Sequence, residues 1–268
     1  MTMAQTFRRL HDGANLLLLP NAWDAGSARL IESRGAKAIA TTSAGLAWAR
    51  GYPDGDALPP ERLFAAVREI ARVVRVPLSV DIEGGYSDDP TAVGRVVAGV
   101  LDAGGVGINL EDGRGTPAAL CAKIAAARKS AERAGIDLFI NARTDIYLRG
   151  LAPGDDAVDE VARRAERYRA AGCDGLFVPG LSDGAAIRAI ALAIDPLPLN
   201  VMLVPGMPSN EQLRTQGVRR LSAGSAIAQA VLGRASLLTD AFLAGRKEDL
   251  FAGAAEYGAI NKLFPGDR

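Results

Sequence analysis

Leu78-Ser79-Val80-Asp81-Ile82-Glu83-Gly84-Gly85-Tyr86 is an apolar run that breaks into two carboxylates and then into glycines. The same design recurs at Val106-Gly107-Ile108-Asn109-Leu110-Glu111-Asp112 and at Leu138-Phe139-Ile140-Asn141-Ala142-Arg143-Thr144-Asp145. Short apolar runs bounded by turn residues are typical of buried strands. Polar side chains at the C-terminal ends of successive strands converge only where the strands are parallel, as at the active-site end of a (β/α)8 barrel. These three stretches therefore predict an α/β barrel with an acidic site.

The whole chain alternates short apolar runs with Ala/Arg/Glu-rich amphipathic segments. Eight strands are expected, at residues 16–19, 38–41, 78–81, 107–110, 138–141, 175–178, 200–204 and 220–222. Helices are expected at residues 25–33, 60–74, 91–103, 117–134, 156–171, 184–193 and 210–216. This alternation predicts parallel strands with right-handed crossovers, and eight strands favour a closed TIM-type barrel. No Gly-x-Gly-x-x-Gly motif follows the first strand, which argues against a dinucleotide-binding fold.

The length of 268 residues matches one barrel, which typically needs about 250 residues. No linker or low-complexity tract interrupts the chain, so residues 1–268 are expected to form a single domain. Residues 225–268 exceed what the barrel needs and predict a C-terminal helical extension. Its apolar positions, such as Leu237, Phe242 and Phe251, either cover the flank of the barrel or form an oligomer contact.

Composition and charge exclude several classes of partner. Basic and acidic residues balance at 31 each without a basic stripe, so no nucleic-acid partner is expected. The N-terminus lacks a signal-peptide core and Leu16–Leu19 is too short to span a bilayer, so we expect a cytoplasmic protein without membrane contact. Cys121 and Cys173 lack metal-ligand spacing and are expected within helices, as small apolar groups. His11, the only histidine, is expected in a surface or capping contact.

Three carboxylates form the predicted metal site. Asp81 ends an apolar strand. An unpaired buried carboxylate there would lower folding stability by roughly several kcal/mol unless a cation offset its charge. Glu83 lies on the same face of that strand, and Glu111 ends the next one. Mg2+ keeps several waters and takes few direct carboxylates, which suits this set. The alternative is that these side chains are helix N-caps and arginine partners at the barrel mouth. Asp112 is expected to be a cap or loop residue.

Substrate contacts are expected beside the metal. The Arg143 guanidinium could fork onto a substrate carboxylate or polarise a carbonyl group, or it could pair within the acidic ring, with Asp145 orienting its neighbours. The turn Thr41-Thr42-Ser43-Ala44-Gly45 offers backbone N–H groups for a carboxylate, with Ser43, Ala44 and Gly45 as candidates. Asn200, at the start of its strand, is a further candidate. By composition alone, Asp54 is a turn residue.

Taken together and in order, these motifs identify a family resemblance. The carrying residues are Leu19-Pro20-Asn21-Ala22-Trp23-Asp24-Ala25-Gly26-Ser27-Ala28, Thr42-Ser43-Ala44-Gly45, Gly51-Tyr52-Pro53-Asp54-Gly55-Asp56, Val80-Asp81-Ile82-Glu83-Gly84-Gly85-Tyr86, Asn109-Leu110-Glu111-Asp112 and Asn141-Ala142-Arg143-Thr144-Asp145. The chain resembles the isocitrate lyase/phosphoenolpyruvate mutase superfamily over almost its full length, and most of all its short bacterial PEP mutase-like members.

The resemblance implies a barrel whose last helix is swapped between neighbours, usually in a dimer of dimers, that is, a homotetramer. It implies a Mg2+ site, with Mn2+ as an alternative ion. Asp81 would be the direct ligand, and Asp54, Glu83 and Glu111 would reach the ion largely through water. The loop at Ser43 and Ala44 would bind the substrate carboxylate, and Arg143 would contact a bound 2-oxo acid or enolate.

The chain also departs from the family pattern. The isocitrate-type lid, Lys-Lys/Arg-Cys-Gly-His, is absent, since Gly113-Arg114-Gly115-Thr116-Pro117 leads directly into a helix that contains Cys121. A second departure is Phe177-Val178-Pro179-Gly180, where methylisocitrate-type lyases place a glutamate after the sixth strand. We expect a Mg2+-dependent lyase that cleaves a small 2-oxo or 2-hydroxy (di)carboxylate by retro-Claisen reaction or decarboxylation. Its general base is Tyr52 or a metal-bound water, with Asp54 as a further catalytic candidate.

Two alternatives stay open. One is PEP or phosphonopyruvate phosphonomutase or hydrolase chemistry, against which the missing lid argues. The other is a 2-oxo acid binding protein with little turnover, because an intact metal site without a lid acid is what such a binder would have.

Overall fold

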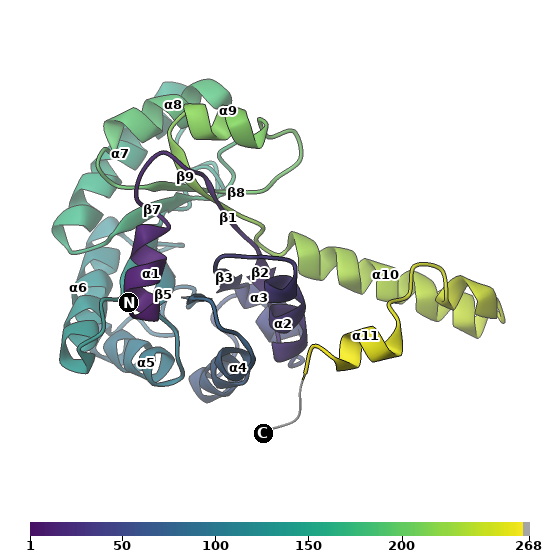
Figure 1. Ribbon diagram of the computed structural model, residues 1–268. Coiled ribbons are helices and arrows are strands. Elements are labelled where there is room, and N and C mark those ends of the chain that lie inside the picture. Colours follow the sequence, from purple (N-terminus) through teal and green to yellow (C-terminus); the bar gives the residue numbers. More distant parts are fainter. Residues whose placement is uncertain (265–268) are drawn as a thin grey trace.

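The computed structural model describes residues 1–264, with the exception of the Asp155 side chain. Positions 265–268 of the predicted extension lie outside the described residues. One parallel sheet forms the centre (Figure 1), with the strand order β1-β9-β8-β7-β6-β5-β4-β3-β2. Its strands are β1 (Leu17–Leu19), β2 (Asn21–Ala22), β3 (Ile39–Thr41), β4 (Leu78–Asp81), β5 (Gly107–Glu111), β6 (Phe139–Arg143), β7 (Gly175–Val178), β8 (Leu199–Met202) and β9 (Val218–Ser222).

The sheet closes into a barrel through a divided first strand. β1 pairs with β9 and β2 pairs with β3, so the two short strands on either side of Pro20 act as one. Proline has no N–H to donate, but the Pro20 carbonyl still accepts from the Ala40 N–H at 3.0 Å. The predicted (β/α)8 fold is therefore confirmed. Each predicted strand and helix is found within two residues of its expected ends.

An outer ring of helices covers the barrel (Figure 1). It consists of α2 (Ala25–Ser33), α4 (Pro60–Val73), α5 (Pro90–Asp102), α6 (Pro117–Ala134), α7 (Gly154–Ala170), α8 (Gly184–Ala193) and α9 (Asn210–Thr215). The sequence sets their ends. Asp89 caps α5 by accepting from the Thr91 and Ala92 N–H groups, and Gly135 ends α6 in the left-handed conformation. Outward-facing side chains such as Val80 and Ile108 pack against these helices in the main core.

The barrel interior is unusually polar. TIM barrels usually fill this space with branched apolar side chains. Here the Asn141 amide on β6 donates to Asn109 on β5 and to Asn200 on β8, both at 2.9 Å. Arg220 on β9 reaches Asn109 at 3.1 Å. Side chains from strands this far apart in the sheet meet only inside the barrel.

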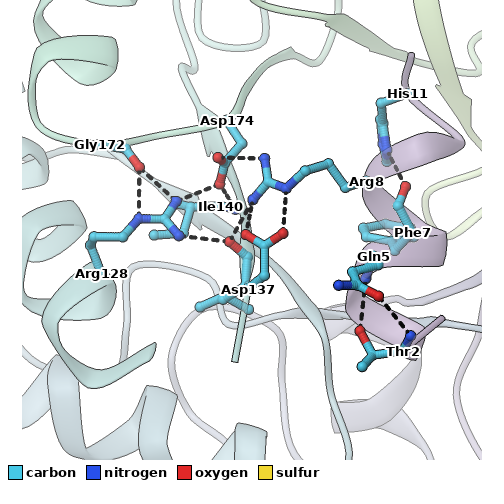
Figure 2. Close-up of polar contacts among 11 residues, drawn as sticks. Thr2, Gln5, Phe7, Arg8, His11, Arg128, Asp137, Ile140, Gly172 and Asp174 are labelled. Atoms are coloured by element: carbon cyan, nitrogen blue, oxygen red, sulfur yellow. Dashed lines mark hydrogen bonds and ion pairs between the residues drawn. The ribbon is translucent and has the colours of Figure 1, made fainter. Parts of the chain in front are cut away.

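Helix α1 (Met3–Arg9) closes the N-terminal end of the barrel with an aromatic plug. Phe7 is fully buried, and a Cβ atom on Gly107 would lie 2.5 Å from the Phe7 ring, so only glycine fits there. Arg8 fixes α1 to the strands by donating to Asp137 at 2.9 and 2.7 Å and to Asp174 at 2.8 Å (Figure 2).

His11 belongs to this plug. Its Nδ1 donates to the Phe7 carbonyl at 2.9 Å, so the expected capping contact is confirmed, as Figure 2 shows. The expected surface position is wrong, because the ring is buried and stacks on Phe139 at 4.1 Å. Burial, aided by Arg220, lowers the pKa of His11 to about 3. Cys121 lies within α6 as expected, but the prediction for Cys173 is wrong, since it occupies the buried turn before β7.

The C-terminal extension departs from the barrel. It comprises α10 (Ala226–Leu243), the 3-10 helix η1 (Lys247–Leu250) and α11 (Tyr257–Asn261), and α10 projects into solvent in Figure 1. Only Ala228 and Ala241 of α10 are buried, so this helix does not cover its own flank. The uncovered outer face of β1 lines an apolar cavity of about 850 Å3, with Leu30, Leu221 and Ile227 in its wall. Within the described part of the chain, α10 alone has the length and composition to span a bilayer.

Candidate active site

The C-terminal ends of three neighbouring strands bring the predicted acidic residues together. Asp81 ends β4, Glu111 ends β5 and Arg143 ends β6, with Glu111 and Arg143 in register as Cα partners. The Arg143 Nη1 lies 2.6 Å from the Glu111 Oε2. Both predicted roles of Arg143 therefore stay available, because an ion pair within the acidic ring coexists with a position at the barrel mouth.

Asp81 lies at the centre of the site and is 8% exposed. Burial raises the pKa of its carboxyl group, and the charge of Asp54 raises it further. Arg143, the Glu83 N–H and the Asn109 amide act in the opposite direction. The Glu83 N–H donates to the Asp81 Oδ1 at 3.1 Å. Asp81 is thus a buried carboxylate with fewer partners than its charge requires.

Glu83 connects the site to the loop that carries Asp54. Its Oε2 accepts from the Gly55 N–H at 2.8 Å and from the Asp56 N–H, and its Oε1 accepts from the Tyr86 hydroxyl at 3.3 Å. Burial, together with the charges of Asp81, Asp56 and Asp54, raises the pKa of Glu83 to about 7. Glu83 therefore holds two loops together as well as facing the acidic cluster.

Backbone strain gathers at the same point. Asp56, Glu83 and Tyr86 have φ values of 57°, 51° and 58°, which is the left-handed region that favours glycine. Such residues cost about 1–3 kcal/mol each and cluster at functional sites. Asp56 accepts from the Tyr86 N–H at 3.0 Å, so the three strained residues contact one another. Sequence reasoning missed Asp56 and Tyr86, although both lie inside the motifs that carried the resemblance.

The Asp145 carboxylate holds the Arg143 guanidinium in place. The fully buried Asp145 accepts from the Arg143 Nε at 2.7 Å and from the Arg149 Nε at 2.9 Å. Burial lowers the pKa of Arg143, but Glu111 and Asp145 outweigh this and keep it above its ordinary value. Burial raises the pKa of Glu111 to about 8, with Arg143 opposing. Asp145 thus orients its neighbour as expected, and Arg143 stays charged.

Asp112 lies in the loop after β5, which confirms one of its two expected positions, whereas the cap of α6 is Thr116. It accepts from the Arg164 Nη1 and the Tyr168 hydroxyl, both at 2.7 Å, and from the Asp145 N–H at 3.0 Å. These bonds fix the start of the loop after β5 to α7 and leave Asp112 outside the acidic cluster.

The other predicted contacts divide into two groups. Ser43, Ala44 and Gly45 open α3 (Ser43–Trp48) directly after β3, where Thr42 caps the helix. By contrast, the Asn200 amide lies within the barrel network and donates to the Val201 carbonyl at 2.7 Å. Tyr52 lines a surface hollow with Arg62 and Glu69 of α4, and no contact in the described region joins it to Asp81 or Glu83. The tyrosine hydroxyl that lies at the cluster is that of Tyr86.

The donor set fits a hard divalent ion with few direct ligands. Within residues 1–264, no three His, Cys, Asp or Glu side chains alone are close enough to enclose a metal. Mg2+ commonly takes one or two carboxylates and completes its shell with water. Asp81, Glu83 and Glu111 all have raised pKa values, and Arg143 is the one basic side chain among the described residues that pairs with any of them. A divalent cation would offset this excess negative charge.

Comparison with known proteins gives one family. The model of the phosphoenolpyruvate phosphomutase family matches residues 7–243. The solved structure of a provisionally named phosphonomutase of Burkholderia cenocepacia is 41% identical, covers 88% of this chain and 99% of that one, and superposes with a TM-score of 0.83. An uncharacterised protein of Mycobacterium tuberculosis is 37% identical over 82% of both chains. An oxaloacetate decarboxylase of Ectopseudomonas mendocina is 32% identical over 66% of this chain and 62% of its own.

Proposed function

This chain belongs to the phosphoenolpyruvate phosphomutase family, within the isocitrate lyase/PEP mutase superfamily, and on that premise we propose that it is a Mg2+-dependent carbon–carbon lyase. Its substrate would be a small 2-oxo or 2-hydroxy (di)carboxylate, cleaved by retro-Claisen reaction or decarboxylation. The surplus of buried carboxylates around Asp81 carries the proposal, because such a surplus calls for a cation. The oxaloacetate decarboxylase relative supports the substrate class.

The residues would divide the work as follows. When bound, Mg2+ or Mn2+ would offset the negative charge of the enolate that forms as the bond beside a 2-oxo group breaks. Asp81 would hold the ion directly, with Glu83, Glu111 and Asp54 contacting it through water. Arg143 would bind the substrate carboxylate, because Asp145 fixes its guanidinium and its charge is retained.

Substrate orientation and proton transfer complete the scheme. The backbone N–H groups of Ser43 and Ala44, at the start of α3, would bind a carboxylate oxygen. Asn200 would act by supporting the amide network inside the barrel. We assign proton transfer to Asp54 acting through water, because its charge acts on Asp81 and Glu83, whereas no contact within residues 1–264 joins Tyr52 to them.

Phosphonomutase or phosphonopyruvate hydrolase chemistry is the second candidate, favoured by the name of the 41% identical relative. Against it stands the short connection between β5 and α6, residues 112–116, which offers little chain to close over a reacting phosphoryl group. A 2-oxo acid binding protein without turnover is the third outcome.

An NMR time course distinguishes the three. The protein would be mixed with Mg2+ and oxaloacetate, 2-methylisocitrate, alkylated malates, 2-oxoglutarate and phosphonopyruvate, with EDTA as control. EDTA-sensitive loss of a carbon–carbon bond in one acid, absent in Asp81→Ala, is the expected result. Turnover of phosphonopyruvate alone would establish the second candidate. Mg2+-dependent line broadening without turnover would establish a binder, and full Mg2+-dependent turnover by Asp81→Ala would contradict the metal assignment.

We further propose a cytoplasmic homo-oligomer, a dimer of dimers, in which α10 of one subunit covers the open flank of another. Exposed Leu237, Phe242 and Leu243 on α10 and the apolar cavity beside β1 support this arrangement, since each is an apolar surface without a partner in the described chain. Light scattering of the parent and of a Leu237→Glu/Phe242→Glu variant tests it. The expected result is a tetramer that dissociates on substitution, and a monomeric parent would refute it.

A further inference from the structure

Arg220 is a buried cation that the proposed chemistry does not use. It is 1% exposed and heads the fully buried side chains by size. Its Nη2 donates to the Asn109 Oδ1 at 3.1 Å, while its Nε and Nη1 have no hydrogen-bond partner among the described residues. No carboxylate within residues 1–264 lies within 4.0 Å of it, because none of the ion pairs there includes Arg220.

The unpaired guanidinium lowers the stability of the fold, as functional groups often do. A buried charge without an ion-pair partner destabilises a fold, and an apolar side chain of similar size at the same place is often more stable. The surroundings offer little compensation, since the guanidinium carbon lies 6.0 Å from the centre of the Phe7 ring and the nearby His11 is uncharged. A group that breaks the packing rules without an evident structural gain marks a functional position.

One amide connects Arg220 to the acidic site. Asn109 is the Cα partner of Asp81 on β4 and of Asn141 on β6. Its Oδ1 accepts from both Arg220 and Asn141, so its NH2 group is left to face Asp81. Burial lowers the pKa of Arg220, and the charge of Asp81 opposes this. The Asn109 amide therefore links the guanidinium to the proposed metal ligand.

We propose that Arg220 is the internal counter-charge of the metal site: a fixed cation that balances Asp81 while no ion is bound and weakens the binding of the ion when it arrives. The proposal rests on the Mg2+ site of the proposed function. Arg220 touches neither ion nor substrate, so it is a positioning residue that acts through Asn109. Like charges repel more strongly in a buried site than in water, so the sign is fixed. Loss of the guanidinium charge makes the ion bind more tightly.

Arg220→Met and Arg220→Lys test this, with Mg2+ affinity measured by calorimetry at pH 8 and Mn2+ affinity by the EPR signal of the free ion. We expect Arg220→Met to bind both ions at least tenfold more tightly than the parent, and Arg220→Lys to remain within threefold of it. The melting temperature of Arg220→Met should also rise more on addition of Mg2+ than that of the parent. Equal or weaker binding by Arg220→Met overturns the proposal.

The matched control is Arg128→Met. Arg128 pairs with Asp174 at the opposite end of the barrel (Figure 2), so its loss should lower stability without changing ion affinity. If Arg220→Met folds only with Mg2+, the proposal is supported. If Arg220→Met folds neither with nor without Mg2+, the Mg2+ affinities of Arg220→Gln and Arg220→Lys are compared instead. The glutamine variant is expected to bind Mg2+ tenfold more tightly than the lysine variant. A parent that binds neither ion refutes the proposed function, whereas binding by the parent without a charge effect refutes only the role of Arg220.

Discussion

Replacing Glu111 by glutamine should stabilise the metal-free protein at high pH. The Glu111 side chain is 15% exposed, and burial raises its pKa from 4.5 to about 8. A carboxyl group whose folded pKa exceeds its unfolded value binds more protons when folded, so the stability it contributes is lost as pH rises between the two values. At about 1.36 kcal/mol per pKa unit, Glu111 should cost about 3 kcal/mol of unfolding free energy between pH 5.5 and 8.5.

Urea unfolding in EDTA at pH 5.5 and 8.5 measures this. The unfolding free energy of Glu111→Gln should lie within about 1.5 kcal/mol of that of the parent at pH 5.5. At pH 8.5 it should exceed that of the parent by roughly several kcal/mol. Mg2+ should restore the stability of the parent at pH 8.5, because binding to the ionised site offsets the charge. The exposed Glu61→Gln on α4 serves as the control. A parent whose stability is the same at both pH values would refute this reasoning, as would a glutamine variant no more stable at pH 8.5.

Three further results are expected. Asp81→Asn should abolish the binding of Mg2+ in calorimetry while the protein stays folded by circular dichroism; unchanged affinity would remove Asp81 from the metal site. Phe7→Ala should lower the unfolding free energy by about 3–5 kcal/mol, because it removes a fully buried ring. Its Mg2+ affinity should stay at the parental value, and a tenfold change would show that the plug and the site are coupled. Tyr86→Phe removes the hydroxyl that donates to the Glu83 carboxylate and should speed proteolysis within residues 51–58; an unchanged cleavage rate would mean that this bond does not restrain the loop.

The fold could be predicted because its signals are local. Each strand is an apolar run bounded by turn residues, and each helix between strands is amphipathic. The order and spacing of these local patterns were therefore enough to predict the barrel. The division of the first strand at Pro20 was not expected, because it depends on which neighbours β1 and β2 find across the barrel. The position of α10 was left open for the same reason, since an apolar helix carries no information about which surface it covers.

The site was predictable where function and strand ends coincide. Asp81, Glu111 and Arg143 end buried strands, so their convergence follows from parallel geometry alone. Glu83 lies two residues beyond β4. Asp56, Tyr86 and Arg220 escaped prediction because their roles arise from contacts between distant segments and from left-handed backbone angles. The burial of His11 was not expected because its segment is polar, although the Phe139 ring on which it stacks comes from elsewhere in the chain.

The aromatic plug determines how molecules enter and leave the acidic site. Phe7, His11 and Phe139 seal one end of the barrel, so the acidic site opens to solvent only at the other end. Substrate, water and products must therefore share one entrance. A product that lingers blocks the next substrate molecule from entering. If the proposed cleavage yields two fragments, the one nearer the mouth should leave first, and the one that leaves last should inhibit competitively with substrate.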